Sequence, residues 1–101
     1  MNNELETEKY EVVYVLDPSY EERQAEKEER LQSIIEAEGG QVEGKDEWGK
    51  LRTAYEIEDN REGLYVLFNF NCPTDRVDEI AERSNVEEGV MRYQIVRREE
   101  E

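Results

Sequence analysis

Residues 10–20, YEVVYVLDPSY, carry the clearest structural signal in the chain. Apolar residues occupy both faces of the strand that Tyr10–Leu16 predicts, which indicates a strand inside a sheet and not at its edge. The DPS motif that follows predicts a turn, and Ser19 with Glu22 three residues later has the pattern of a capping box. This stretch therefore predicts a central strand followed directly by a helix.

The rest of the chain extends this pattern to six elements. Helices are expected at Glu21–Glu38, which ends at a glycine pair, and at residues 71–85, with Pro73 at the first helical position. Further strands are expected at Val42–Ile57, Leu64–Phe70 and Val90–Val96. The first of these is poor in apolar residues, which favours a sheet edge.

The order strand, helix, strand, strand, helix, strand predicts an α+β fold. It is the ferredoxin-like, split βαββαβ arrangement, with a four-stranded antiparallel sheet and two helices on one face. We expect residues 1–8 to be a disordered N-terminal extension, residues 9–97 to form the domain and residues 98–101 to be a short acidic tail.

Composition limits the possible functions. The 101 residues carry a formal net charge of −15, which opposes nucleic-acid binding at ordinary ionic strength. The excess of glutamate over lysine is typical of proteins from salt-rich cytoplasm, and it equally fits an acidic member of a mesophilic family. No apolar run is long enough for a membrane helix, no signal peptide is apparent, and the lone cysteine, Cys72, favours a reducing cytoplasm.

Catalytic chemistry is not indicated. The chain has no histidine, and Cys72 falls in the apolar register of the third strand, which predicts a core position. Carboxylate pairs such as Glu28-Glu29 and Glu87-Glu88 are too numerous to mark a site and are expected on solvated faces. We therefore expect no catalytic residue, no metal site and no cofactor.

The stretch WGKLRTAYEI, residues 48–57, resembles a signature of the family of bacterial small-subunit ribosomal protein six. Four other segments resemble the same family in the same order: YEVVYVLDP, IIEAEGGQV, GLYVLFNF and GVMRYQIVR. The resemblance extends from Lys9 to Arg97. The sequence departs from the family pattern at Leu51, Glu56, Ser84 and Met91, which leaves its RNA-facing charge thin.

The resemblance implies a structural protein of the cytoplasmic ribosome and not an enzyme. Its implied partners are the central domain of the small-subunit ribosomal RNA and small-subunit protein eighteen, with no membrane and a monomeric state in isolation. The RNA-binding residues that it implies are Lys9, Tyr10, Lys50, Arg52, Arg92 and Arg97. The partner-binding residues that we expect are Trp48, Leu51 and Tyr55.

Other interpretations stay open at this point. Lys50 and Arg52 could be charges that protect an edge strand from aggregation, and Trp48 could be a packing residue. The chain could be a free-standing acidic ferredoxin-like protein-interaction domain, or a designed or reconstructed sequence of this family. An acylphosphatase-like hydrolase would need an arginine in a phosphate-binding loop after the first strand, which DPSYEER does not resemble.

Overall fold

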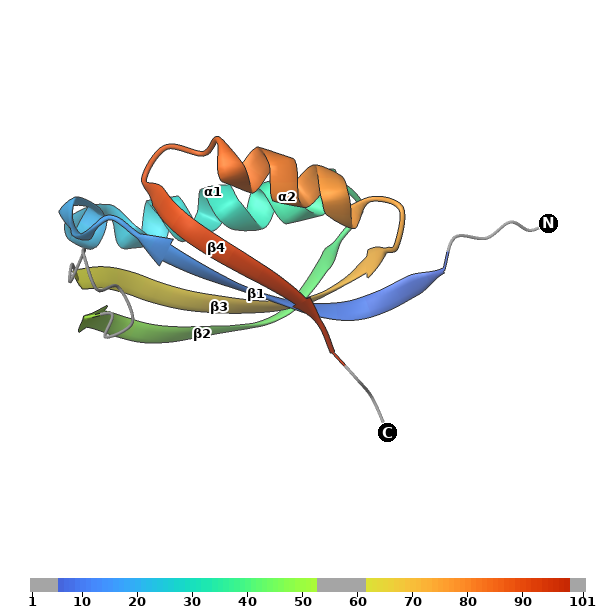
Figure 1. Cartoon of the computed structure of the whole chain (residues 1–101), viewed down its shortest axis with the longest axis horizontal. Coiled ribbons are helices and arrows are strands. Elements are labelled where there is room, and N and C mark those ends of the chain that lie inside the picture. Colours follow the sequence, from blue (N-terminus) through green and yellow to red (C-terminus); the bar gives the residue numbers. More distant parts are fainter. Residues whose placement is uncertain (1–5, 53–61, 99–101) are drawn as a thin grey trace.

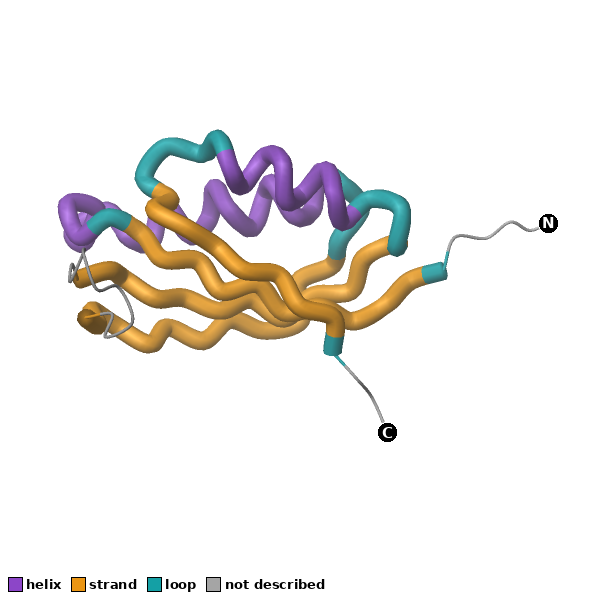
Figure 2. The backbone as a smooth tube through the Cα atoms, in the orientation of Figure 1, coloured by secondary structure: helices purple, strands orange, loops and turns teal. Residues whose placement is uncertain are grey.

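The computed structural model describes residues 6–52 and 62–98. Two helices lie side by side over one face of a four-stranded antiparallel sheet (Figures 1 and 2). The elements in chain order are β1 (Thr7–Leu16), η1 (Pro18–Arg23), α1 (Gln24–Ala37), β2 (Gln41–Arg52), β3 (Glu62–Pro73), α2 (Val77–Asn85) and β4 (Val90–Arg97). The predicted fold class is confirmed.

The sheet has the strand order β2-β3-β1-β4. Strand β1 is central, as its two apolar faces predict, and it pairs with β3 from Thr7 opposite Pro73 to Leu16 opposite Leu64. Strand β4 pairs with the other side of β1, and β2 pairs only with β3. The expected edge position of β2 is therefore confirmed.

The core lies between the sheet and the two helices. Alternate residues of β1 and β3 point into it, among them Tyr14, Phe68 and Phe70, and each is at most 1% exposed. Leu31, Ile34 and Ile35 of α1 and Ile80 of α2 cover them. Cys72 is also buried in this core, in the register that the sequence predicts.

One polar contact crosses the core. The hydroxyl groups of Tyr14 on β1 and Ser84 on α2 are 2.6 Å apart and hydrogen-bonded, and both residues are fully buried. Burial raises the pKa of Tyr14 to about 12. The serine that ends the apolar stripe of α2 thus has a defined buried partner.

Both helices begin later than the sequence predicts. Residues Pro18–Arg23 form a 3-10 helix, and the carboxylate of Asp17, not the hydroxyl of Ser19, accepts a hydrogen bond at its start, from the Ser19 N–H at 2.9 Å. Pro73 does not start α2; it ends β3, because β1 begins at Thr7 and gives it a strand partner. The expected extension 1–8 thus overlaps β1 at Thr7 and Glu8.

The edge strand β2 is irregular. Its register with β3 shifts between Val42 and Gly44 and between Glu47 and Gly49. Gly49 has φ +93°, a conformation that favours glycine. The expected bends at the two glycines therefore correspond to β-bulges, which protect an exposed sheet edge from pairing with other chains.

The solvated position expected for Glu28 is wrong. Glu28 is 2% exposed, and its two carboxylate oxygens accept hydrogen bonds of 2.8 Å from Lys45 of β2 and from Gln24 of α1. Burial alone would raise the pKa of Glu28, but hydrogen bonds with Glu47, Lys45 and Gln24 outweigh burial and lower it. A buried ion pair thus links α1 to the irregular edge strand β2. The pattern of apolar residues along the helix does not predict this contact.

We predict that Glu28→Ala lowers the free energy of unfolding by about 1–3 kcal/mol, because it removes two hydrogen bonds from a buried charged acceptor. Chemical denaturation near neutral pH measures this change. Phe70→Ala sets the upper reference at about 3–5 kcal/mol, the usual loss for a buried phenylalanine.

Glu29→Ala is the matched control. It removes the same charge at the next position, which is exposed, and should change stability by less than about 0.5 kcal/mol. Equal unfolding free energies for the two alanine variants would show that the contact between Glu28 and Lys45 contributes nothing.

Candidate RNA and protein interface

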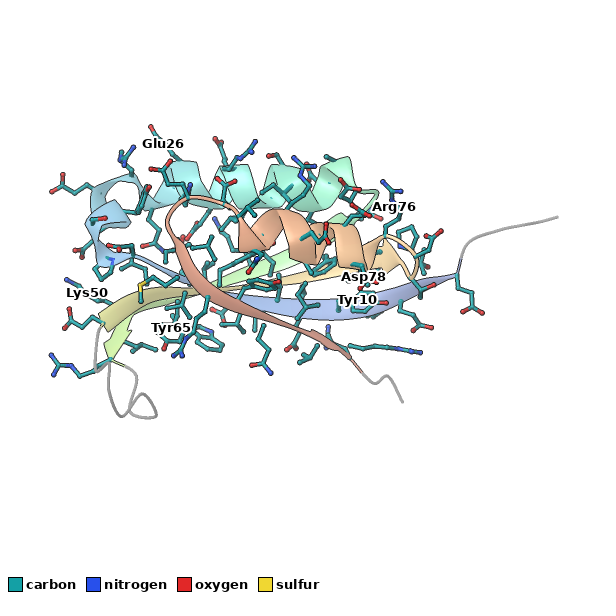
Figure 3. The ribbon with its side chains drawn as sticks, turned by 45° about the horizontal axis from the view of Figure 1, so that its top comes forward. Tyr10, Glu26, Lys50, Tyr65, Arg76 and Asp78 are labelled. Carbon is teal, nitrogen blue, oxygen red and sulfur yellow. The ribbon has the colours of Figure 1, made fainter. Side chains whose placement is uncertain are left out.

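The sheet face opposite the helices, here called the open face, carries an aromatic pair. The Trp48 and Tyr65 rings stack with their centroids 6.2 Å apart and an interplanar angle of 14°. Figure 3 shows Tyr65 projecting from the sheet on the side away from the helices. In the register of the sheet, Tyr65 of β3 lies opposite Val15 of β1, and Val15 lies opposite Arg92 of β4. One row of this face therefore joins an aromatic pair to an arginine.

The two described residues predicted to bind a protein partner belong to this open face. Trp48 is 45% exposed and Leu51 is 43% exposed. Their exposure gives apolar surface that a partner could cover. Tyr55, the third predicted residue, lies outside the described residues.

A buried polar atom on the same sheet lacks a partner. The Asn69 side chain comes from an open-face position of β3, and its Oδ1 atom has no hydrogen-bond donor within the described ranges. Such a group is rare in a folded protein.

Strand β4 stands apart from the other elements by its charge. It carries Arg92 and Arg97 and no carboxylate, and it is the one described element in which cations outnumber carboxylates. Arg98 adds a third cation directly after it. In a chain with a net charge of −15, β4 is therefore the most favourable position for a phosphate group.

A hollow of about 420 Å³ lies beside β4, between this strand and α2. It is lined by Tyr10, Val77, Asp78, Ala81, Tyr93, Gln94, Ile95 and Arg97. Tyr10 and Arg97 lie opposite each other in the pairing of β1 with β4, so the structure brings two of the predicted RNA-binding residues together here.

Tyr10 is mostly a core residue. It is 7% exposed, and its ring stacks on Phe70 at a centroid distance of 5.6 Å. Burial raises the pKa of Tyr10, and the nearby Arg97 guanidinium opposes that rise. Only the part of this residue that lines the hollow is accessible to a ligand.

The other cationic residues that are predicted to bind RNA are spread over the sheet, and they form ion pairs. Lys50 Nζ is 3.2 Å from a Glu21 oxygen, and Arg52 Nη2 is 3.8 Å from a Glu62 oxygen. Both come from the helix-facing side of β2, at the end of the sheet far from Arg97, where Figure 3 labels Lys50. The predicted alternation of Lys50 and Arg52 with Leu51 along β2 agrees with this placement.

Lys9 and Arg97 lie at the opposite end and also have acidic partners. Lys9 Nζ is 3.3 Å from Glu43 Oε1 and 3.3 Å from Asn71 Oδ1. Arg97 Nη2 is 3.0 Å from Glu8 Oε2, and the Arg97 side chain stays 59% exposed. A phosphate at either position would therefore compete with a carboxylate of the chain itself.

A second cationic cluster surrounds Tyr20. The Arg23 guanidinium and the Lys27 ammonium lie 4.8 and 5.1 Å from the Tyr20 ring centroid. Glu87, which precedes β4, accepts a 2.9 Å hydrogen bond from Lys27 and 3.3 Å hydrogen bonds from Arg30. Glu87 is thus a structural ion-pair partner and not the solvated residue that the sequence predicts.

Known proteins with similar sequences identify the family. The sequence model of ribosomal protein S6 matches residues 9–97. The chain belongs to the ribosomal protein S6 family. Members of this family are structural components of the small ribosomal subunit in the cytoplasm, they bind RNA in translation, and they are not enzymes.

The relatives of this S6 chain are close and cover nearly its whole length. The small ribosomal subunit protein bS6 of Natranaerobius thermophilus is 44% identical over 92 residues, which are 90% of this chain and 96% of the relative. The bS6 protein of Caldanaerobacter subterraneus subsp. tengcongensis is 42% identical over 89 residues, or 87% and 94% of the two chains.

Solved structures agree with this assignment. The 30S ribosomal protein S6 from Thermotoga maritima has a TM-score of 0.82 and 28% sequence identity, and the match covers 92% of this chain and 89% of that one. The C-terminal domain of MgtC from Mycobacterium tuberculosis has a TM-score of 0.63 at 10% identity, over 96% and 92% of the two chains, and shares the fold alone.

The described residues contain neither a membrane span nor a metal-binding cluster. No helix there has the length and apolar character needed to cross a membrane. No group of histidine, cysteine or acidic side chains in the same part of the chain could hold a metal ion.

Sequence reasoning missed several residues of these surfaces. The role of Tyr65 as a surface aromatic follows from its stacking with Trp48, which comes from a different strand. Asp78, Tyr93 and Gln94 reach the hollow from α2 and β4, which are brought together only by packing. In the sequence, only the alternation of Tyr93 with its polar neighbours Arg92 and Gln94 pointed to this surface, and that pattern indicates a strand and not a binding site.

We predict that Glu87 makes stability depend on pH in the acidic range. Burial would raise the Glu87 pKa, but Lys27 and Arg30 outweigh burial and hold it below its ordinary value of 4.5. Ionised Glu87 therefore stabilises the folded chain at neutral pH, and this contribution is lost as the pH falls through the lowered pKa. Glu87→Gln should reduce stability by about 1 kcal/mol at neutral pH and by progressively less below about pH 4.5.

Urea unfolding between neutral and acidic pH measures the difference between the parent chain and this variant. Glu88→Gln removes the same charge at an exposed neighbouring position and should give a small difference. A difference for Glu87→Gln that stays constant down to pH 3 would contradict the ion-pair explanation.

Proposed function

We propose that the chain binds the central domain of the small-subunit ribosomal RNA as a heterodimer with small-subunit protein eighteen. Membership of the S6 family over residues 9–97 is the observation that carries this proposal. The role is one of binding and assembly, in which the chain contributes shape, apolar contacts and a few cations.

The charge of the chain makes the partner protein necessary. A net charge of −15 repels RNA, and the ion pairs of Lys9, Lys50, Arg52 and Arg97 reduce the cationic surface further. A basic partner that docks first would supply the missing positive charge. Binding of partner and RNA is then cooperative, because each makes the association of the other more favourable.

The two surfaces have different roles in this proposal. Arg92 and Arg97 of β4 contact RNA phosphates, with Lys9, Lys50 and Arg52 as further contacts at the two ends of the sheet. The open face around Trp48 and Leu51 contacts the partner protein. Tyr10 contributes only where it lines the hollow.

The ion pairs of the predicted cations favour a second candidate function. A free-standing protein-interaction domain that has lost its RNA surface would also pair its cations with its own carboxylates. Co-sedimentation in a salt-matched lysate distinguishes the two candidates: an assembled ribosomal protein sediments with small subunits, and a free-standing domain does not.

We predict that Lys50→Ala/Arg52→Ala weakens RNA binding by the heterodimer and leaves the heterodimer intact. The slope of the logarithm of affinity against the logarithm of salt concentration should flatten by up to about one unit per lost phosphate contact. Filter binding over a range of salt concentrations gives both quantities. Unchanged affinity and slope would show that these cations only protect the sheet edge and bind Glu21 and Glu62.

We predict the opposite pattern for Trp48→Ala. Loss of a half-exposed indole from the open face should weaken heterodimer formation about tenfold or more, as expected for an aromatic residue at the centre of an interface. Calorimetric titration of the two proteins without RNA measures this effect.

Val86→Ala is the control for this experiment. Val86 is 79% exposed but lies at the end of α2, on the helix side of the molecule. Equal affinities for the Trp48 and Val86 variants would exclude the open face as the protein-binding surface.

A further inference from the structure

The hollow between α2 and β4 contains polar groups without a partner. Asp78 is exposed in the first turn of α2, and its carboxylate has no hydrogen-bond or ion-pair partner among residues 6–52 and 62–98. The same holds for the Tyr10 hydroxyl, although Tyr10 is nearly buried. Figure 3 shows these two residues close together at the start of α2.

We propose that this hollow binds one unpaired nucleotide of the RNA, with the base inside and the phosphate at Arg97. The inference rests on the proposed function and adds to it the position and chemistry of a single base contact. RNA-binding proteins read sequence mainly from unpaired bases, which they hold between aromatic or apolar side chains and by hydrogen bonds to the base edges.

The walls of the hollow suit a base. Tyr10 and Tyr93 supply ring surface, and Val77, Ala81 and Ile95 supply aliphatic surface. The volume of about 420 Å³ falls in the range of small-molecule sites, roughly 300–1,000 Å³. A few convergent polar groups in a mainly apolar hollow are the usual composition of such a site.

The polar groups select the kind of base. An ionised carboxylate only accepts hydrogen bonds, so Asp78 requires a base that donates them. The Watson–Crick edge of guanine presents two adjacent N–H donors, which match the two oxygens of a carboxylate. Uracil presents one N–H donor between two carbonyl oxygens, which the carboxylate would repel. We therefore infer a preference for guanine.

Charge favours RNA over a peptide as the occupant. Strand β4 is a free sheet edge, so an extended peptide could in principle add a strand there. That mode depends on backbone hydrogen bonds and leaves the Asp78 carboxylate without a donor. A nucleotide satisfies Asp78 and at the same time brings a phosphate to the strand that carries Arg92 and Arg97.

The decisive experiment compares Asp78→Asn with Glu79→Gln. The two residues are neighbours in the first turn of α2 and each change removes one negative charge, but only Asp78 lines the hollow. Simple electrostatics predicts that both changes slightly strengthen RNA binding. The proposal predicts that Asp78→Asn weakens it about tenfold, the effect of losing hydrogen bonds to a charged acceptor, and that Glu79→Gln does not.

Nucleotide titration of the isolated chain is the second measurement. Guanosine monophosphate at millimolar concentration should shift the NMR signals of Tyr10, Asp78 and Tyr93 more than uridine monophosphate does, and Asp78→Asn should abolish the difference. Inorganic phosphate should shift only the signals near Arg97. Equal effects of both nucleotides and of phosphate would overturn the proposal, and so would equal RNA affinities of the Asp78 and Glu79 variants.

Glu8→Gln tests whether Arg97 contacts the phosphate of the nucleotide. Its carboxylate holds Arg97 at 3.0 Å, so its removal should strengthen nucleotide binding severalfold. Weaker or unchanged binding would exclude Arg97 as the phosphate contact. If the parent heterodimer does not bind ribosomal RNA, the proposed function fails, whereas nucleotide binding by the isolated chain still tests the hollow.

Discussion

Strand β1 lies between β3 and β4, and this central position fixes what each face of the sheet carries. Each register pair on one side of β1 fixes a pair on the other side, so Tyr65, Val15 and Arg92 fall in one row and Tyr10 falls beside Arg97. The same alternation sends Tyr14 into the core and Val13 to the open face. A shift of one residue would exchange the two faces and destroy the core and both surfaces together.

Charge is organised around this apolar centre. Most of the described cations are held by carboxylates from other elements, as in Lys45 with Glu28 and Arg76 with Glu38. These pairs link the helices to the sheet and to each other where apolar side chains are few. Strand β4 is the exception in composition, because it brings arginines and no carboxylate to the free edge of the sheet. Strand β4 thus concentrates positive charge in a strongly acidic chain.

The two faces of the sheet differ in the groups that they leave accessible. The helix face is closed by the core and by ion pairs, so it contributes stability. The open face and the β4 edge leave aromatic, arginine and unpartnered polar groups accessible. A partner protein on the open face and RNA along β4 would use surfaces that share the same strands without overlapping at Trp48 and Asp78.

The element order, the central position of β1, the edge position of β2 and the family are all predictable from the sequence alone. These follow from local patterns: alternation within a strand, glycines at a helix end and five motifs in order. Helix starts were missed because Asp17 competes with Ser19 as a cap, and Pro73 suits a strand end as well as a helix start. Packing brings Glu28 to Lys45 and Glu87 to Lys27, stacks Trp48 on Tyr65, and places Tyr10, Asp78 and Arg97 around one hollow. Each of these contacts joins residues that are far apart in the sequence or on different elements, so their distance is set by packing and register, which no local pattern records.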